Sequence, residues 1–202
     1  MSSRDTMLAS LRVSRPQVDR PLPTVSLFDG LQPPSLVAAF KKNLEKMGGL
    51  LLEPPIGSDA LAPLREKIAD AKVVCSTVPE IAGNRAIARI AAPRELADVD
   101  FAIVRAAFGV AETGSLLLID GELRVNALAY LAQHLIVLLD PADIVVNLHH
   151  AYRRPEFHVG HYAAFHTGPS ATADIEGVLI HGAQGVRSLS VVLIAKRSRP
   201  RD

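Results

Sequence analysis

The stretch HLIVLLD, residues 134–140, sets the narrowest limit on what this chain can fold into. It is apolar at every position from Leu135 to Leu139. Because successive side chains of a β-strand point to opposite faces, an unbroken apolar run indicates a strand that is covered on both sides. Strands of this kind belong to parallel sheets with further layers packed on both faces, so the stretch favours an α/β fold.

The residues before this stretch alternate between helical and strand patterns. Ser35 is a good N-cap for a helix that buries Phe40 and Leu44 and ends at Gly48-Gly49. A short strand (50–53), a second helix that begins at Ser58, and the strand KVVCSTV (72–78) follow. Helices and strands joined by short connections predict one α/β domain with a mixed, mostly parallel sheet.

The second half of the chain is richer in strands. We expect a helix to begin at Pro141 and run to about Tyr152, and a loop over RRPEFHVGHY (153–162). Further strands are expected within residues 100–110, 114–120, 177–182 and 188–195.

Composition excludes several classes of function. Net charge is +1, apolar residues make up 49% and charged residues 21%, which is typical of a soluble globular protein and not of a DNA-binding or membrane protein. The one cysteine, Cys75, lies in an apolar run and is expected in the core. A single cysteine allows no disulfide within the chain and no self-contained iron–sulfur cluster. We expect a cytoplasmic protein without a cofactor or metal of its own.

The two ends of the chain differ from its middle. Residues 1–34 combine a short amphipathic helix, expected to dock on a neighbouring surface, with a proline-rich arm. Residues 196–202 form a basic tail, interpreted as solubilising rather than as a nucleic-acid arm. The α/β domain is therefore expected over residues 35–195.

Two polar turns carry the candidate chemistry. In HTGPSATADIEG (166–177), Gly168, Pro169 and Ser170 are expected to open a helix, whose N-terminus could bind an anion. An alternative is that Ser170 only caps this helix, with Asp174 and Glu176 complementing its dipole. In the second turn, AETG, Glu112 lies between two apolar strands, where a carboxylate is costly unless it is paired or functional. A hairpin turn with an exposed Glu112 is the alternative there. Two such turns suggest a shared cleft.

Together, AETGSLLL, TGPSATADIE and HGAQGVRSLSVVLI resemble the LUD-domain family, the lactate-utilisation protein C group. The likeness runs from about Asp100 to Ile194. Ala171 stands where many relatives have a basic residue, and HGAQGVRSL differs from their His-Gly-Pro arrangement. The resemblance implies a fold like that of NagB, RpiA and the CoA transferases. It also implies a role in bacterial growth on L-lactate beside partner proteins that carry iron–sulfur clusters.

Carried over by position, and with His166 added because it adjoins the turn, the predicted ligand-binding residues belong to the two turns. They are Glu112, Thr113, Gly114, His166, Thr167, Gly168, Pro169, Ser170, Thr172, Asp174 and Glu176.

Five of the seven histidines fall between His149 and His166. Their spacing matches no short zinc-ligand pattern, so we interpret the segment as a loop that faces solvent or ligand, and not as a metal site. His181, before Gly182, is a second candidate for the rim of the pocket.

The leading hypothesis is a component of lactate oxidation to pyruvate that binds a small anionic ligand between the two turns. One alternative is acyl or CoA transfer with Glu112 as the nucleophile, because AETG resembles the Glu-Asn-Gly turn of CoA transferases. Another is a non-catalytic subunit that assembles the cluster-bearing partners.

Overall fold

The run 134–140 forms the central strand of the protein, as its pattern predicts. In the computed structural model this strand is β6 (His134–Leu139), and it lies between β11 (Ser188–Leu193) and β3 (Phe101–Arg105). All three strands are parallel. Residues Leu135–Leu139 are completely buried. The structure describes residues 2–16, 21, 23–158, 160–173, 179–181 and 185–196.

Sheet A has five parallel strands in the order β1-β11-β6-β3-β2, with β1 at Leu50–Leu51 and β2 at Val74–Ser76. Sheet B has four strands in the order β7-β4-β5-β8. Its strands are β4 (Phe108–Val110), β5 (Ser115–Ile119), β7 (Ile144–Val145) and β8 (Ala163–His166). A hairpin of β9 (Ala171–Ala173) and β10 (Leu179–His181) stands apart from both.

The α/β class and the parallel sheet are confirmed, but the strand expected over 100–110 is divided between two sheets. Ala106 N donates to Leu138 O in sheet A, whereas the next amide, Ala107 N, donates to Leu117 O in sheet B. Two small residues therefore carry the chain from one sheet into the other. An apolar strand pattern does not reveal such a change of partner, because both halves are equally buried.

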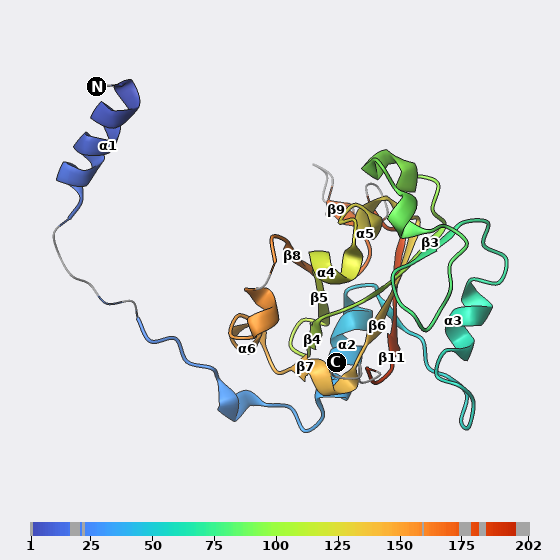
Figure 1. Cartoon of the computed structure of the whole chain (residues 1–202). Coiled ribbons are helices and arrows are strands. Elements are labelled where there is room, and N and C mark those ends of the chain that lie inside the picture. Colours follow the sequence, from blue (N-terminus) through green and yellow to red (C-terminus); the bar gives the residue numbers. More distant parts are fainter. Residues whose placement is uncertain are drawn as a thin grey trace, which may run out of the picture.

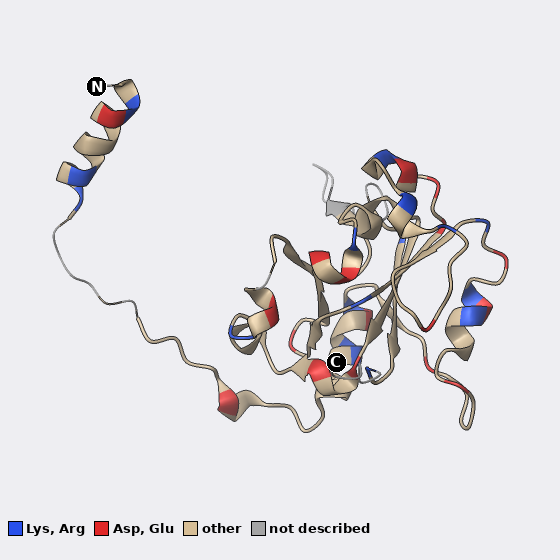
Figure 2. Cartoon of the chain, in the orientation of Figure 1, with Lys and Arg blue, Asp and Glu red and all other residues tan. Residues whose placement is uncertain are grey.

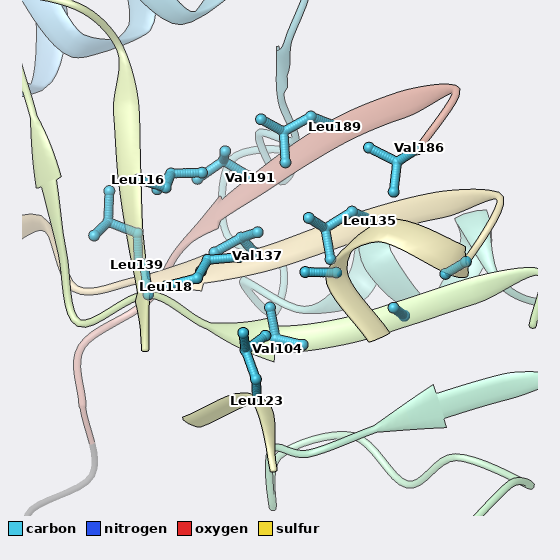
Figure 3. Close-up of a cluster of buried hydrophobic side chains, with 14 of the residues drawn as sticks. Val104, Leu116, Leu118, Leu123, Leu135, Val137, Leu139, Val186, Leu189 and Val191 are labelled. Carbon is cyan, nitrogen blue, oxygen red and sulfur yellow. The ribbon is translucent and has the colours of Figure 1, made fainter. Parts of the chain in front are cut away.

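Alternation along β6 explains how the layers stack. Val137 and Leu139 face the core between the two sheets, together with Leu116 and Leu118 of β5 (Figure 3). Ile136 and Leu138 face the opposite core, under α3 (Ala62–Lys67). Figure 1 shows α3 on one side of sheet A and sheet B on the other. The strand is covered on both faces, as the unbroken apolar run predicts.

Helices complete the layers. α2 (Leu36–Lys46) begins at the predicted cap, where Ser35 Oγ accepts a hydrogen bond from Ala38 N, and it buries Phe40 and Leu44 between the sheets. Four further helices are α4, α5, α6 and α1. The first three are single turns that bury one or two side chains each, whereas the N-terminal α1 buries none. Their bounds are Asp120–Leu123, Leu128–Leu131, Leu148–Ala151 and Ser3–Ser14.

Single turns of 3₁₀ helix connect these elements. They are η1 (Asp29–Leu31), η2 (Ile87–Arg89), η3 (Pro93–Leu96), η4 (Pro141–Asp143) and η5 (Pro155–Phe157).

The prediction of one helix from Pro141 to about Tyr152 is wrong. The chain forms η4, then β7, and only then α6. Ile144 and Val145 pair in parallel with Gly109 and Val110 of β4, and these backbone hydrogen bonds override the local helical spacing. The helix expected to begin at Ser58 is shorter than predicted, because α3 has its N-cap at Leu61.

The N-terminal helix is present, but it buries no residue. Figure 1 shows α1 standing away from the rest of the chain, and Met7 and Leu11 on its apolar side are exposed. Closer to the domain, the arm is held in place, because Asn147 Nδ2 donates to Leu27 O over 2.8 Å. No helix in the described part of the chain is long and apolar enough to cross a membrane. Cys75 is fully buried in β2, as predicted.

Gly114 offers a test of the packing. Its φ is +68°, and a Cβ at this position would lie 2.2 Å from Leu44 N in the backbone of α2. We expect Gly114→Ala to lower the free energy of unfolding by about 2–4 kcal/mol, measured by urea denaturation, because both the backbone angle and the helix contact are lost.

Gly121→Ala is the matched control, since a Cβ there meets nothing within 4 Å. It lies in α4 and is expected to leave stability unchanged or raise it by up to about 1 kcal/mol. Equal effects of the two substitutions would contradict the contact between Gly114 and α2.

Candidate functional site

The turn AETG connects β4 and β5 as a hairpin that rests on α2. Gly114 N donates to Val110 O over 2.9 Å and closes the turn. Asn43 of α2 donates from its side-chain amide to the carbonyl oxygens of Ala111 and Glu112, over 2.8 and 2.9 Å. Glycine is required at position 114 for two reasons. Its φ is positive, and a Cβ there would collide with the backbone of α2.

The turn that follows β8 rests on the same helix. Gly168 has φ +79°, and a Cβ there would lie 2.0 Å from the carbonyl oxygen of Met47, the C-cap of α2. The glycines of both motifs are therefore fitted against one helix, which lies 60 residues or more earlier in the sequence. Neither could be exchanged for a larger residue without displacing α2.

A chain of hydroxyl groups joins the two turns. Thr113 Oγ1 lies 2.7 Å from Ser115 Oγ, which lies 2.6 Å from Thr167 Oγ1. Three hydroxyls carry three protons, and the two hydrogen bonds within the chain use two of them. One of the three O–H groups is left to donate to a further acceptor.

These hydroxyls line a hollow of about 440 Å³, called here the hydroxyl hollow. Lys46, in the last turn of α2, contributes a positive charge to its wall, and Glu112 contributes a negative one. Tyr152 and Phe165 add aromatic surface. The mixture of a few polar groups with apolar walls is typical of small-molecule sites, and the volume lies within their usual range.

Glu112 stands at the border of a second hollow, of about 480 Å³, which the N-terminal arm covers. Its side chain is exposed, and Oε2 accepts a hydrogen bond from Leu148 N over 3.2 Å. The arm residues Phe28 and Leu31 line this hollow, and the ring of Phe28 lies 5.0 Å from that of His149. The hairpin alternative, with an exposed Glu112, describes the local geometry correctly.

A third hollow, of about 330 Å³, lies beside the HTGPS stretch and is called here the His166 hollow. His166 faces away from Phe165, as alternation along β8 requires, and its ring lies 5.1 Å from that of Tyr130. Burial lowers the pKa of His166 to about 4. Among the described residues, no group forms a hydrogen bond with its buried Nε2. The His166 hollow is also lined by Gly168, Pro169 and Ser170.

The expected cleft is thus divided between two adjoining hollows. Glu112 and Thr113 line the hydroxyl hollow, and Ser170 lines the His166 hollow. Thr167 and Phe165 line both. The structure brings Thr113 and Thr167 together through Ser115, but it places Ser170 beyond them.

The prediction that a helix begins at Ser170 is wrong. Ala171–Ala173 form strand β9, which pairs antiparallel with Leu179–His181. Pairing with β10, which begins six residues after β9 ends, replaces the helical hydrogen bonds that the turn signals favoured, so residues 171–173 offer no helix N-terminus to an anion. Thr172 lies in β9, and Asp174 and Glu176 lie outside the described residues.

The comparisons with known proteins agree with the motifs. The family model of the LUD domain matches residues 64–194. The chain belongs to the LUD-domain family. Its fold is similar to that of a DUF162 family protein from Deinococcus radiodurans, with 15% sequence identity and a TM-score of 0.59. The similarity covers 78% of this chain and 95% of that one. No curated protein matches the sequence.

His149, His150 and His158 of this LUD domain each contact a different partner. His150 Nε2 lies 2.8 Å from Asp29 Oδ1 on the arm, and His158 Nε2 lies 2.9 Å from Tyr152 O. His149 packs on Phe28. Within the described residues, no three side chains of His, Cys, Asp or Glu form a group that could hold a metal.

Sequence reasoning missed several residues of the site. Asn43 and Lys46 come from α2, which precedes the matched family region, and no local motif marks them. Ser115 directly follows the first turn, but it is not among the residues predicted to bind a ligand. Tyr130 forms a short hydrogen bond with Tyr162, and burial together with this bond raises the pKa of Tyr162. The phenol of Tyr162 therefore stays neutral, and Tyr130 lines the His166 hollow.

Another missed feature is a buried ion pair at the carboxyl end of β3. Arg105 Nη2 lies 2.5 Å from Glu80 Oε1, and the two side chains are 8% and 4% exposed. Arg105 Nη1 and Glu80 Oε2 have no hydrogen-bond partner among the described residues. Removing either residue would leave a buried charge without its counterion, so the pair is a structural constraint on the loop after β2.

His166 predicts a pH dependence of stability. Its pKa is about 4 in the folded protein and near 6.5 when unfolded, so the unfolded state binds the proton more strongly. This contribution to stability is present above pH 6.5 and is lost as the pH falls toward 4. Between pH 7 and 4.5, we expect the wild type to lose roughly 2–3 kcal/mol more than His166→Phe, measured by urea denaturation. Parallel pH profiles of the two proteins would show that the imidazole is not buried as described.

Proposed function

We propose that this LUD-domain protein is a component of L-lactate utilisation that binds a small carboxylate in the hydroxyl hollow. LUD-domain proteins are associated with lactate utilisation generally. The observation that carries the proposal is the chain Thr113–Ser115–Thr167, which joins the two motifs of the family by hydrogen bonds. Its one remaining O–H can donate to an anionic oxygen.

Charge supports the choice of a carboxylate. The amine of Lys46 forms no ion pair among the described residues, so it is available to a ligand in the same hollow. A carboxylate that reaches both Lys46 and Thr167 would gain two charge-assisted hydrogen bonds, one of them from a cation. Tyr152 and Phe165 give apolar contact to the short carbon chain of such a ligand.

The oxidation itself needs an electron acceptor, and we assign that role to partner proteins with iron–sulfur clusters. This chain has one cysteine, and it is buried in sheet A. A cluster held by four thiolates therefore cannot be built from this chain alone. On this proposal the chain contributes binding and positioning of the carboxylate, and it works in the cytoplasm beside those partners.

Growth on L-lactate tests the proposal. We expect Thr167→Val, which removes one hydroxyl while keeping the shape, and Lys46→Gln to fold within about 1–2 kcal/mol of the wild type. Each should fail to restore growth in a strain that lacks its own copy of this gene. Lys42→Gln, on the same helix but outside the hollow, is the control and should restore growth.

A folded Thr167→Val/Lys46→Gln double variant that restores full growth would contradict the ligand site. It would favour a non-catalytic assembly subunit, for which the surface and not the hollow matters.

Acyl or CoA transfer is the second candidate function, and the position of Glu112 favours it. The carboxylate is exposed at the border of two hollows, so an acyl thioester could reach it. In such a reaction the carboxylate attacks the thioester carbonyl, CoA leaves as thiolate, and the thiolate then attacks the glutamyl anhydride to form a glutamyl–CoA thioester and release the acid.

Mass spectrometry separates the two candidates. If Glu112 is a nucleophile, incubation with acetyl-CoA adds the mass of a CoA thioester to the wild type and not to Glu112→Gln. We expect no adduct on the wild type, because the leading proposal gives Glu112 no covalent role.

A further inference from the structure

A hollow of about 430 Å³ lies at the amino ends of the strands of sheet A and shares no lining residue with the three hollows described above. Phe101 of β3 and His134 of β6 form its floor, and Gln133 adjoins them. It is called here the amino-edge hollow.

Three cationic side chains from separate parts of the chain line this hollow. Lys67 ends α3, whose basic residues are visible in Figure 2, Lys72 precedes β2, and Arg187 precedes β11. None of the three forms an ion pair among the described residues, in contrast to Arg65, Arg85 and Arg154. All three residues are exposed, and their positive charges border the same hollow, where they repel one another.

The acidic residues of the hollow neutralise these charges only in part. Asp100 Oδ2 accepts hydrogen bonds from the backbone N–H groups of Lys72 and Val73, over 2.8 and 2.9 Å. Asp70 also lines the hollow, but it forms no ion pair within the described residues. The lining therefore holds three cationic and two acidic side chains, which leaves it with one excess positive charge.

His134 lies within the electrostatic influence of two of the three cations. Its Nδ1 lies 2.8 Å from Ser188 Oγ, and its ring stacks on Phe101 with centroids 4.8 Å apart. Burial lowers the pKa of His134, and the charges of Lys67 and Arg187 lower it further, while Asp100 opposes them. Lys67 of α3 and Arg187 before β11 thus both act electrostatically on the same imidazole.

We propose that the amino-edge hollow binds the phosphate group of a small phosphorylated molecule, held by Lys67, Lys72 and Arg187 above the stacked rings of His134 and Phe101. Phosphate matches three converging cations better than a single carboxylate does, because it carries up to two charges on three or more oxygens. The volume exceeds that of inorganic phosphate and leaves room for an organic part.

His134 provides the readout. Its pKa can be followed by NMR in the full chain, with and without inorganic pyrophosphate at constant ionic strength. A bound anion favours the imidazolium, so we expect pyrophosphate to raise the pKa of His134 by roughly half a unit or more. Lys67→Gln/Arg187→Gln should raise this pKa without any ligand, because two repelling cations are removed. It should also weaken pyrophosphate binding at least tenfold.

Lys42→Gln/Arg94→Gln is the matched control, since it removes the same charge from residues outside the hollow. It should leave both the pKa of His134 and the affinity unchanged. The proposal is overturned if pyrophosphate leaves the pKa of His134 unchanged in the wild type, or if the two double variants lose affinity equally. A shift of the same size with acetate would replace the phosphate class by a carboxylate and would equally contradict the proposal. None of these outcomes depends on the role in lactate utilisation.

Discussion

The packing of two glycine turns against one helix is the constraint on which the candidate site depends. Gly114 lies on the backbone of α2 at Asn43 and Leu44, and Gly168 lies on its C-cap, Met47. Both turns come from sheet B, but α2 also buries Phe40 and Leu44 in the core between the sheets. The helix therefore fixes the two motifs relative to each other and to sheet A. The hydroxyls of Thr113 and Thr167 meet through Ser115 because the turns cannot move apart without losing these contacts.

Sequence patterns predicted those parts of the fold whose signals are local. The unbroken run 135–139 required a strand covered on both faces, and Ser35 with Gly48-Gly49 marked both ends of α2. The errors arose where pairing with another strand decided the structure. Ile144–Val145 became a strand because β4 was available, and Ala171–Ala173 paired with residues 179–181 instead of opening a helix. Helix caps and hydrophobic periodicity do not indicate which segment a strand will pair with.

The same distinction applies to the site. The two motifs were identified from the sequence, and the structure joins Thr113 to Thr167. Neither Lys46 nor Asn43 could be found in this way, because their place beside the motifs depends on how α2 crosses the turns. Neither motif indicates that β8 directs His166 and Phe165 to opposite faces. In the structure the one expected cleft is divided into the hydroxyl hollow and the His166 hollow, which share Phe165 and Thr167.

Crystals of the full chain soaked with L-lactate, and in parallel with pyruvate, test the central claim most directly. The account predicts that the carboxylate of the ligand lies in the hydroxyl hollow, within hydrogen-bond distance of Thr167 Oγ1 and the amine of Lys46. It also predicts that crystals of Thr167→Val/Lys46→Gln stay empty there under the same conditions. Ligand bound elsewhere in the wild type, or bound equally in the double variant, would contradict the claim that the two turns on α2 form a carboxylate site.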